Sequence, residues 1–146
     1  MEHMETAIKL AQRAYKKDEV PIGAVIVCDG KIIAKAFNKR EHASDATAHA
    51  EILAIKQACK KMRDFRLLGC DMYVTLEPCA MCMGAILNSR IENLYFGAYA
   101  NKPNALSCAE INERAGLNHK TNIIGGVMQT ECEQLIKQYF GEKRKK

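Results

Sequence analysis

The sequence predicts an α/β protein in which helices cover both faces of one central, mixed, five-stranded sheet. Three observations lead to this three-layer α/β/α class. The β-branched run 24–27, the turn Asp29-Gly30 and a second apolar run to Phe37 are typical of an antiparallel hairpin. A strand, a helix and a strand then follow in turn over 72–96, which indicates a parallel βαβ unit. Amphipathic helices near both ends of the chain supply outer layers.

The individual helices follow from apolar spacing and from capping signals. Apolar residues recur at helical spacing over 2–17 and 49–62, and a proline opens a further helix at 79–89. Capping-box patterns predict a short helix from Ser107 and a C-terminal helix from Thr130. The segments that remain are strands and one polar loop: strands at 24–27, 31–37, 72–76, 93–96 and 123–128, the last interrupted by two glycines, and a loop at 38–48.

Length and composition bound the class of protein. A chain of 146 residues with 48% hydrophobic residues can bury one core, so we expect residues 1–146 to form a single domain. No apolar run reaches membrane-spanning length, and the polar N-terminus lacks a signal peptide, which together predict a cytoplasmic protein without a membrane partner. Seven cysteines, an odd number, fit a reducing compartment better than a disulfide framework.

The charge balance is weakly informative about partners. A net charge of +5 allows a polyanionic partner without requiring one. The excess of positive charge lies in the runs 60–66 and 143–146, and solvated surface explains such runs equally well.

The stretch from Thr75 to Gly84 concentrates the chemistry of the chain. Cys79 and Cys82 lie three positions apart directly after Pro78, so both sulfurs share one face at the start of a predicted helix. The positive end of the helix dipole favours thiolates at that place. Two thiolates at this spacing are half of a zinc site.

His49 is the histidine best placed to complete this site. It begins the predicted helix 49–62 directly after a loop, whereas the other three histidines lie at the terminus or in polar segments. One histidine and two cysteines give zinc three protein ligands, and a catalytic site leaves the fourth tetrahedral position to water. A closed structural site needs another ligand, and Cys70 and Cys108 lack ligand-like spacing. We therefore favour an open catalytic zinc over a structural one.

Glu51 stands two positions after His49, at the start of the same helix. Zinc lowers the pKa of its water from 15.7 to roughly 7, and a carboxylate at this position can reach that water. We expect Glu51 to take a proton from the water and deliver it to the substrate. The alternative is a first-turn carboxylate that only complements the helix dipole. Its place beside one histidine and two cysteines favours the catalytic interpretation.

The pair of motifs His49-Ala50-Glu51 and Pro78-Cys79-Ala80-Met81-Cys82 resembles the signature of zinc-dependent nucleobase deaminases. The chain resembles the bacterial tRNA-specific adenosine deaminase family over nearly its whole length, in the segments 19–25, 47–51, 75–85, 89–91, 96–98, 118–119 and 126–127 and at Asn38. This resemblance implies a cytidine-deaminase-like fold, bound Zn²⁺ and a homodimer. It also implies conversion of adenosine to inosine at the wobble position of a tRNA anticodon.

The resemblance also implies individual roles. It makes three residues zinc ligands and one the proton shuttle: His49, Cys79, Cys82 and, as the shuttle, Glu51. It assigns substrate contacts to five more, with Asn38 bonding the nucleotide, Val20 and Ile22 walling its pocket, and Tyr139 and Phe140 near the RNA together with the basic tail. An adenosine in an anticodon loop can be splayed out and read on its edges without opening a duplex.

The chain departs from the family pattern between Tyr99 and Leu106, where the usual acidic residue and glycines are missing, and at Ala46, which replaces a proline. These positions bear on RNA contacts and substrate choice rather than on zinc chemistry. Two other functions therefore stay open. One is deamination of a free base or nucleoside such as guanine or cytosine. The other is a non-catalytic RNA-binding module that uses zinc only to fold.

Overall fold

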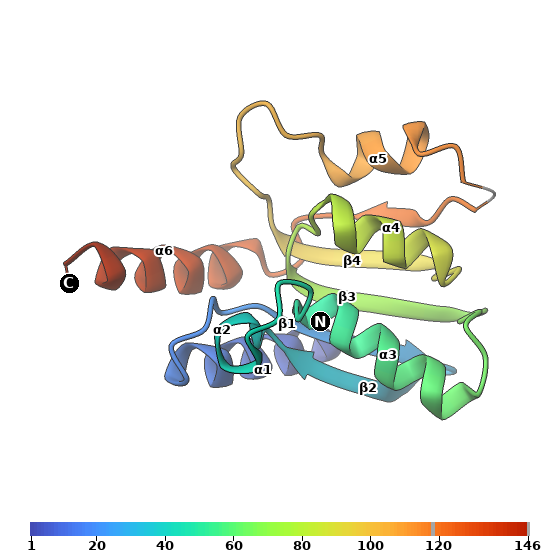
Figure 1. The fold of residues 1–146 in the computed structure, drawn as a ribbon, viewed down its shortest axis with the longest axis horizontal. Coiled ribbons are helices and arrows are strands. Elements are labelled where there is room, and N and C mark those ends of the chain that lie inside the picture. Colours follow the sequence, from blue (N-terminus) through green and yellow to red (C-terminus); the bar gives the residue numbers. More distant parts are fainter. Residues whose placement is uncertain (118, 146) are drawn as a thin grey trace.

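A computed structural model of the protein describes residues 1–117 and 119–145, with side chains as far as Lys143. Eleven elements follow one another (Figure 1): α1 (Glu2–Lys16), β1 (Gly23–Cys28), β2 (Lys31–Phe37), α2 (Arg40–Ala43), α3 (Ala50–Met62), β3 (Cys70–Leu76), α4 (Ala80–Asn88), β4 (Asn93–Ala98), α5 (Cys108–Arg114), β5 (Asn122–Ile124) and α6 (Gln129–Lys145). None of the helices described is both long enough and apolar enough to cross a bilayer.

The five strands form one mixed sheet in the order β2-β1-β3-β4-β5. The hairpin β1–β2 is antiparallel, and β1 also pairs antiparallel with β3. The pairs β3–β4 and β4–β5 are parallel. The predicted five-stranded mixed sheet and the parallel β3-α4-β4 unit are therefore confirmed. Because β3 and β4 run the same way, both carboxyl ends lie at one edge of the sheet, where α4 begins.

Helices cover both faces of this sheet (Figure 1). On one face α3, α4 and α5 pack over a core that includes Ile26, Met72 and Leu94. On the other face α1 packs over Val25 and Phe37, and α6 lies beside α1. Successive residues of β1 are thus buried on opposite faces, which explains why this strand is a continuous apolar run rather than an alternating one.

Two glycines allow the helices of the second face to approach the strands. A Cβ atom at Gly23 would overlap the carbonyl oxygen of Ala7 in α1. A Cβ atom at Gly97, in β4, would overlap the sulfur of Cys132 in α6. The residue type at each position therefore sets how closely the helix packs on the sheet.

Several boundaries differ from the sequence prediction. The segment 38–48 is not entirely a loop, because the short helix α2 forms in it and ends at Ser44 in the left-handed conformation. The last strand stops at Ile124, since Gly126 and Met128 adopt positive φ and turn the chain. The C-terminal helix consequently starts at Gln129, so Thr130 lies inside its first turn and is not the predicted cap. The capping box at Ser107 is confirmed.

All seven cysteines lie in the described part of the chain and are free. Three of the five outside the motif are buried, namely Cys70, Cys108 and Cys132. Cys28 and Cys59 are only half-buried, because they lie near the ends of β1 and α3.

Candidate metal centre

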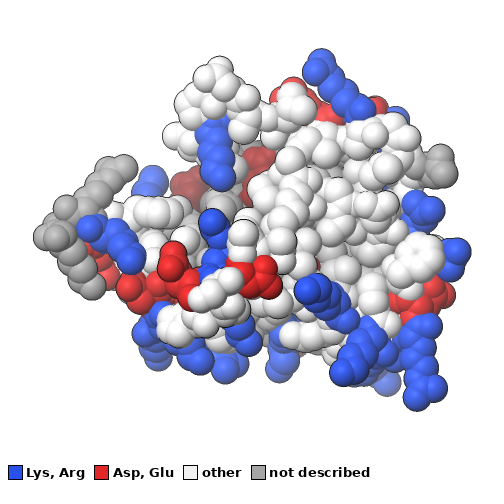
Figure 2. Space-filling view, viewed as in Figure 1, with Lys and Arg blue, Asp and Glu red and all other residues white. Residues whose placement is uncertain are grey.

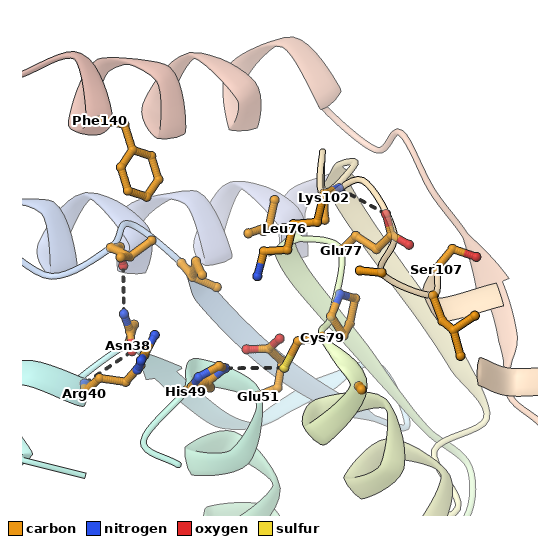
Figure 3. Close-up of a pocket in the computed structure, with 17 residues that line it drawn as sticks. Asn38, Arg40, His49, Glu51, Leu76, Glu77, Cys79, Lys102, Ser107 and Phe140 are labelled. Carbon is orange, nitrogen blue, oxygen red and sulfur yellow. Dashed lines mark hydrogen bonds between the residues drawn. The ribbon is translucent and has the colours of Figure 1, made fainter. Parts of the chain in front are cut away.

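Two neighbouring helix starts bring the predicted ligands together. His49 is the N-cap of α3, and Cys79 is the N-cap of α4. Pro78 therefore precedes the cap rather than occupying the first turn, while Cys82 lies in the first turn of α4. The side chains converge because the N-termini of α3 and α4 lie at the same edge of the sheet (Figures 1 and 3).

The distances fit a tetrahedral zinc ion. His49 Nδ1 lies 3.7 Å from Cys79 Sγ and 3.6 Å from Cys82 Sγ. Zinc bonds of about 2.3 Å to sulfur and 2.0–2.1 Å to nitrogen, at tetrahedral angles, separate the two ligand atoms by about 3.6 Å. Within the described residues this is the one group of His, Cys, Asp or Glu side chains placed to hold a metal. Three ligands leave the fourth position to water or substrate, as in catalytic sites.

The pKa values of the two candidate thiol ligands are shifted in opposite directions. Hydrogen bonds from the Cys82 thiol and from the His49 ring lower the pKa of Cys79 to about 3. The contact with Cys79, together with burial, raises the pKa of Cys82. These shifts favour a thiolate at Cys79 and a thiol at Cys82, and Zn²⁺ held here would be bound by both sulfurs as thiolates.

Glu51 lies in the first turn of α3 and is 3% exposed. Its Oε1 is buried and has no hydrogen-bond partner among the described residues. Burial raises the pKa of this carboxyl to about 7. A buried, unpaired carboxylate oxygen costs stability, and Glu51 lies in the pocket lining beside the candidate ligands (Figure 3).

The candidate ligands line a pocket of about 540 Å³. Two of the candidate ligands, His49 and Cys79, line it together with Glu51. Four of the predicted substrate contacts also line it: Val20, Ile22, Asn38 and Phe140. Cys82 is fully buried behind them. Asn38 uses its amide on the protein, since Nδ2 donates to Val20 O at 3.4 Å and Oδ1 accepts from Arg40 N at 3.3 Å. One N–H and one lone pair of this amide stay available to a ligand.

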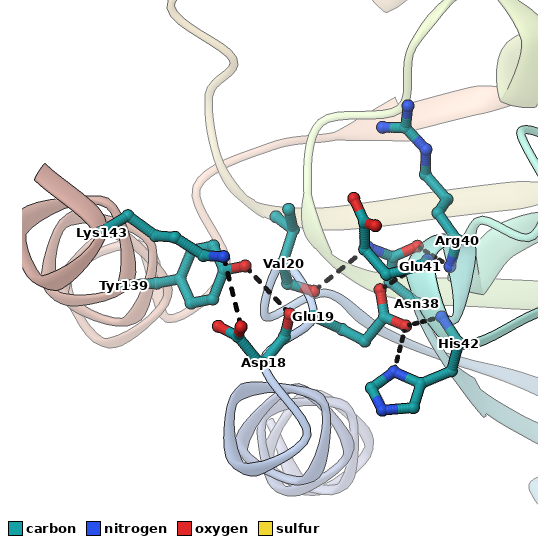
Figure 4. A network of polar contacts seen from close by, with 9 residues as sticks. All are labelled: Asp18, Glu19, Val20, Asn38, Arg40, Glu41, His42, Tyr139 and Lys143. Atoms are coloured by element: carbon teal, nitrogen blue, oxygen red, sulfur yellow. Dashed lines mark hydrogen bonds and ion pairs between the residues drawn. The ribbon is translucent and has the colours of Figure 1, made fainter. Parts of the chain in front are cut away.

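Tyr139 does not line the pocket, and its predicted place near the RNA stays a prediction. Its ring is 6% exposed and packs edge-on against Tyr15. Its hydroxyl donates to Asp18 O at 3.2 Å (Figure 4). Neighbouring helix positions point about 100° apart, so Tyr139 faces the protein while Phe140, 44% exposed, faces the pocket. The basic tail, which we also expect near the RNA, begins at Lys143, and the side chains at 144–146 lie outside the described ones.

A buried carboxylate holds one side of the pocket. Glu19 is 1% exposed and accepts hydrogen bonds from the backbone N–H groups of Glu41 and His42 at 3.1 and 2.8 Å. The His42 ring lies 2.7 Å from the same carboxylate (Figure 4). Burial raises the pKa of Glu19, but these bonds outweigh it and hold the pKa below its usual value. Glu19 thereby fixes the segment that carries Asn38 and Arg40.

A second buried carboxylate holds the opposite side. Glu77 accepts from Ala100 N at 3.1 Å and from Cys108 N at 2.9 Å. These two bonds tie both ends of the segment 100–108, which bends over the pocket and contributes Lys102 to its lining (Figure 3). Sequence reasoning missed Glu19, Glu77, Arg40 and Lys102 as parts of the site. For the two glutamates a signal was present in the sequence, because Glu19 lies two residues before Pro21 and Glu77 directly precedes Pro78.

Comparison with known proteins agrees with this geometry. Residues 1–98 match the family model of the cytidine and deoxycytidylate deaminase zinc-binding region. A tRNA-specific adenosine deaminase of Bacillus subtilis is 44% identical over 145 residues, covering 99% of this chain and 90% of that protein. A solved structure from a study of A-to-I editing by deaminases acting at the wobble position of transfer RNA is 40% identical. It has a TM-score of 0.85 and covers 92% of this chain and 98% of that one.

The chain belongs to the cytidine and deoxycytidylate deaminase family. Within that family its sequence groups with the tRNA-specific adenosine deaminases, as the resemblance predicted. The expected cytidine-deaminase-like fold is confirmed. A guanine deaminase structure from Bacillus subtilis is also similar, with 39% identity and a TM-score of 0.65 over 67% of this deaminase and 63% of that chain.

Proposed function

We propose that the protein catalyses zinc-dependent hydrolytic deamination of adenosine to inosine at the wobble position of a tRNA anticodon. The observation that carries this proposal is the unpaired Oε1 of Glu51 beside the group His49, Cys79 and Cys82, at the base of a pocket with cationic side chains around it. The identity of 44% to a tRNA-specific adenosine deaminase over nearly the full chain supports the choice of substrate.

The reaction replaces the amino group at C6 of adenine by the oxygen of water and releases ammonia. Zinc held by the three proposed ligands supplies a water of lowered pKa. In our proposal Glu51 accepts the proton of this water and transfers it to the base, so that the nitrogen leaves as ammonia. With a divalent cation nearby, the pKa of Glu51 falls from its raised value, because positive charge favours the carboxylate. Its burial keeps bulk water from competing for the proton.

The pocket suits a single flipped-out nucleotide. Val20 and Ile22 give an apolar wall for the base, and Asn38 keeps one N–H and one lone pair for it. Phe140 offers an exposed aromatic ring on which a neighbouring base can stack. Arg40 and Lys102 line the same pocket and supply positive charge for phosphates. A free base would use the apolar wall and the Asn38 amide, but not the Phe140 ring or the two cationic side chains.

We also propose that residues 1–146 form one catalytic domain that acts as a cytoplasmic homodimer. Three large apolar side chains at the end of α3 and in the segment that follows it are exposed, Met62, Phe65 and Leu68, and they offer surface for a second copy. Light scattering on the purified protein at several concentrations would measure the molar mass. A monomer at all concentrations would refute the dimer.

The deciding experiment is an assay on an anticodon stem-loop with adenosine at the wobble position. The proposal expects inosine in the product and none in a matched RNA with guanosine there. Free guanine, cytosine and their nucleosides are assayed in parallel for ammonia.

Two observations favour a second candidate, deamination of a free base such as guanine. The chain is 39% identical to part of a guanine deaminase, and its segment 99–106 departs from the usual tRNA-deaminase pattern. Ammonia from guanine without inosine in the stem-loop would select this alternative.

A further inference from the structure

A second cavity, of about 390 Å³, lies at the edge strand β2, away from the metal group. We call it the β2 groove, and its lining consists of Leu10, Arg13, Lys35, Ala36, Phe37, Lys39, Leu53, Lys56 and Gln57. Four of these nine residues are cationic and none is acidic. In Figure 2 the Lys and Arg side chains gather along the edge of the molecule where α1, β2 and α3 lie.

The positive charges are concentrated around one ring. The Phe37 side chain is 5% exposed, and three cations lie over it: Arg13 at 5.1 Å, Lys39 at 5.1 Å and Lys17 at 5.6 Å from the ring centroid. Each contact is weakly favourable, but three like charges around one ring repel each other. An anion seated among them would remove this repulsion.

No acidic side chain of the described residues forms an ion pair with the cations of the β2 groove. Hydrogen bonds from Thr47 lower the pKa of Asp45, and the positive charge of Lys56 contributes less to the same shift. The Asp45 Oδ1 already accepts two hydrogen bonds from Thr47, each 2.8 Å long. Within the described residues, then, no carboxylate pairs directly with a cation of the groove, and Asp45 acts on Lys56 only from beyond ion-pair distance.

The groove is unsuited to an added β-strand. The backbone N–H of Lys35 on the open edge of β2 donates to Gln57 Oε1 at 3.1 Å, so α3 covers part of this edge. The cations, in contrast, are exposed on long side chains. Charge rather than strand pairing is what the groove offers to a partner.

The groove and the catalytic pocket are linked along the chain at one segment. Asn38 and Arg40 line the catalytic pocket, and Lys39 between them lines the β2 groove. A strand of nucleic acid whose loop enters the pocket would therefore have its flanking backbone at Lys39 and, farther along β2, at Lys35.

We propose that the β2 groove is a second phosphate-binding site, which holds the backbone of the RNA stem next to the loop that enters the catalytic pocket. This inference rests on the proposed RNA substrate. Phosphates would supply the direct ionic partners that Arg13, Lys35, Lys39 and Lys56 do not have among the described residues. The contacts are to backbone, so they position the RNA without reading its sequence.

The test uses the double variant Arg13→Gln/Lys35→Gln, which removes two charges and leaves the pocket lining intact. Its matched control, Lys61→Gln/Arg114→Gln, removes two exposed charges that line neither cavity and form no ion pair with a described residue. Binding of a fluorescent anticodon stem-loop, and of the same loop as a short single strand, is measured over a range of salt concentrations. Inosine formation at saturating stem-loop is followed in a single turnover.

The groove variant should bind the stem-loop about tenfold more weakly and lower the slope of log K against log salt by about 1.4–1.8. Binding of the single strand and the saturating rate should stay unchanged. The control should behave as wild type. Equal slopes for the groove variant and control, or equal weakening for both RNAs, would overturn the proposal. Absence of inosine with the wild-type protein would instead refute the proposed function, and the binding data would still decide the groove.

Discussion

The two halves of the catalytic pocket are built in different ways. The metal half consists of His49, Glu51, Cys79 and Cys82, which sit at the first turns of two adjacent helices. The wall half comes from separate segments, 18–22, 38–43 and 99–107, which two buried carboxylates hold in place. Local helix geometry sets the first half, while hydrogen bonds between distant segments set the second. Changes in the first half should therefore abolish the chemistry, and changes in the second should alter substrate binding.

The largest effect is expected from Cys82→Ser. Loss of one of three proposed ligands should remove most of the zinc and lower activity on the order of a thousandfold or more. Because metal binding and folding are coupled, the melting temperature should fall as well. Elemental analysis and thermal unfolding measure both. Cys59→Ser, a change at a half-buried cysteine outside the site, is the control. Full zinc content in Cys82→Ser would contradict the proposed ligand set.

Glu51→Gln should come next, and it separates chemistry from metal binding. The amide keeps the size of the side chain but cannot accept a proton, so kcat should fall by about 10²–10⁴. Zinc content should match that of wild type. The melting temperature should stay near that of wild type, because Glu51 Oε1 has no hydrogen-bond partner among the described residues and the amide keeps one oxygen acceptor. Turnover near the wild-type value would remove Glu51 from the mechanism.

Glu77→Gln is expected to disturb the wall and leave the metal half intact. The variant loses a charged acceptor for Ala100 N and Cys108 N, worth about 1–3 kcal/mol. The segment over the pocket should loosen, and KM for the stem-loop should rise about tenfold with zinc content unchanged. Glu92→Gln, an exposed carboxylate, serves as control. A fall in kcat with unchanged KM would show that Glu77 acts in the chemistry instead.

The smallest effect concerns stability at acid pH. The pKa of Glu19 is held below its usual value by its bonds to His42 and Glu41, against the opposing effect of burial. A carboxyl with a lowered folded-state pKa stabilises the fold above its unfolded pKa, near 4.5, and loses that contribution as pH falls through the folded value. Glu19→Gln should therefore be less stable than wild type at pH 7, and the difference should shrink toward pH 3.

Denaturant unfolding at several pH values measures this difference. The exposed Glu113→Gln serves as control, since an exposed ion pair such as that with Lys120 contributes little. A constant difference between Glu19→Gln and wild type over the whole range would exclude the ionic contribution of Glu19.

The sequence predictions succeeded for features with a strong local signal, and failed for features that lack one or that depend on contacts between distant segments. Elements with clear periodicity or caps, such as α1, α3 and the capping box at Ser107, were predicted to within one or two residues. The short α2 was missed, because four residues carry no periodic signal. Tyr139 and Phe140 could not be separated, since only the packing of α6 decides which of two neighbours faces inward.

By itself the sequence determined the strands, the two helix starts and the two motifs that carry the candidate ligands, because each depends on spacing within a few residues. The tertiary structure alone decided that the two helix starts meet, with ligand atoms 3.6–3.7 Å apart. It also decided that Glu19 and Glu77 hold the pocket walls and that cations from α1, β2 and α3 form one groove. These arrangements join residues separated by tens of positions, and no local spacing in the chain encodes them.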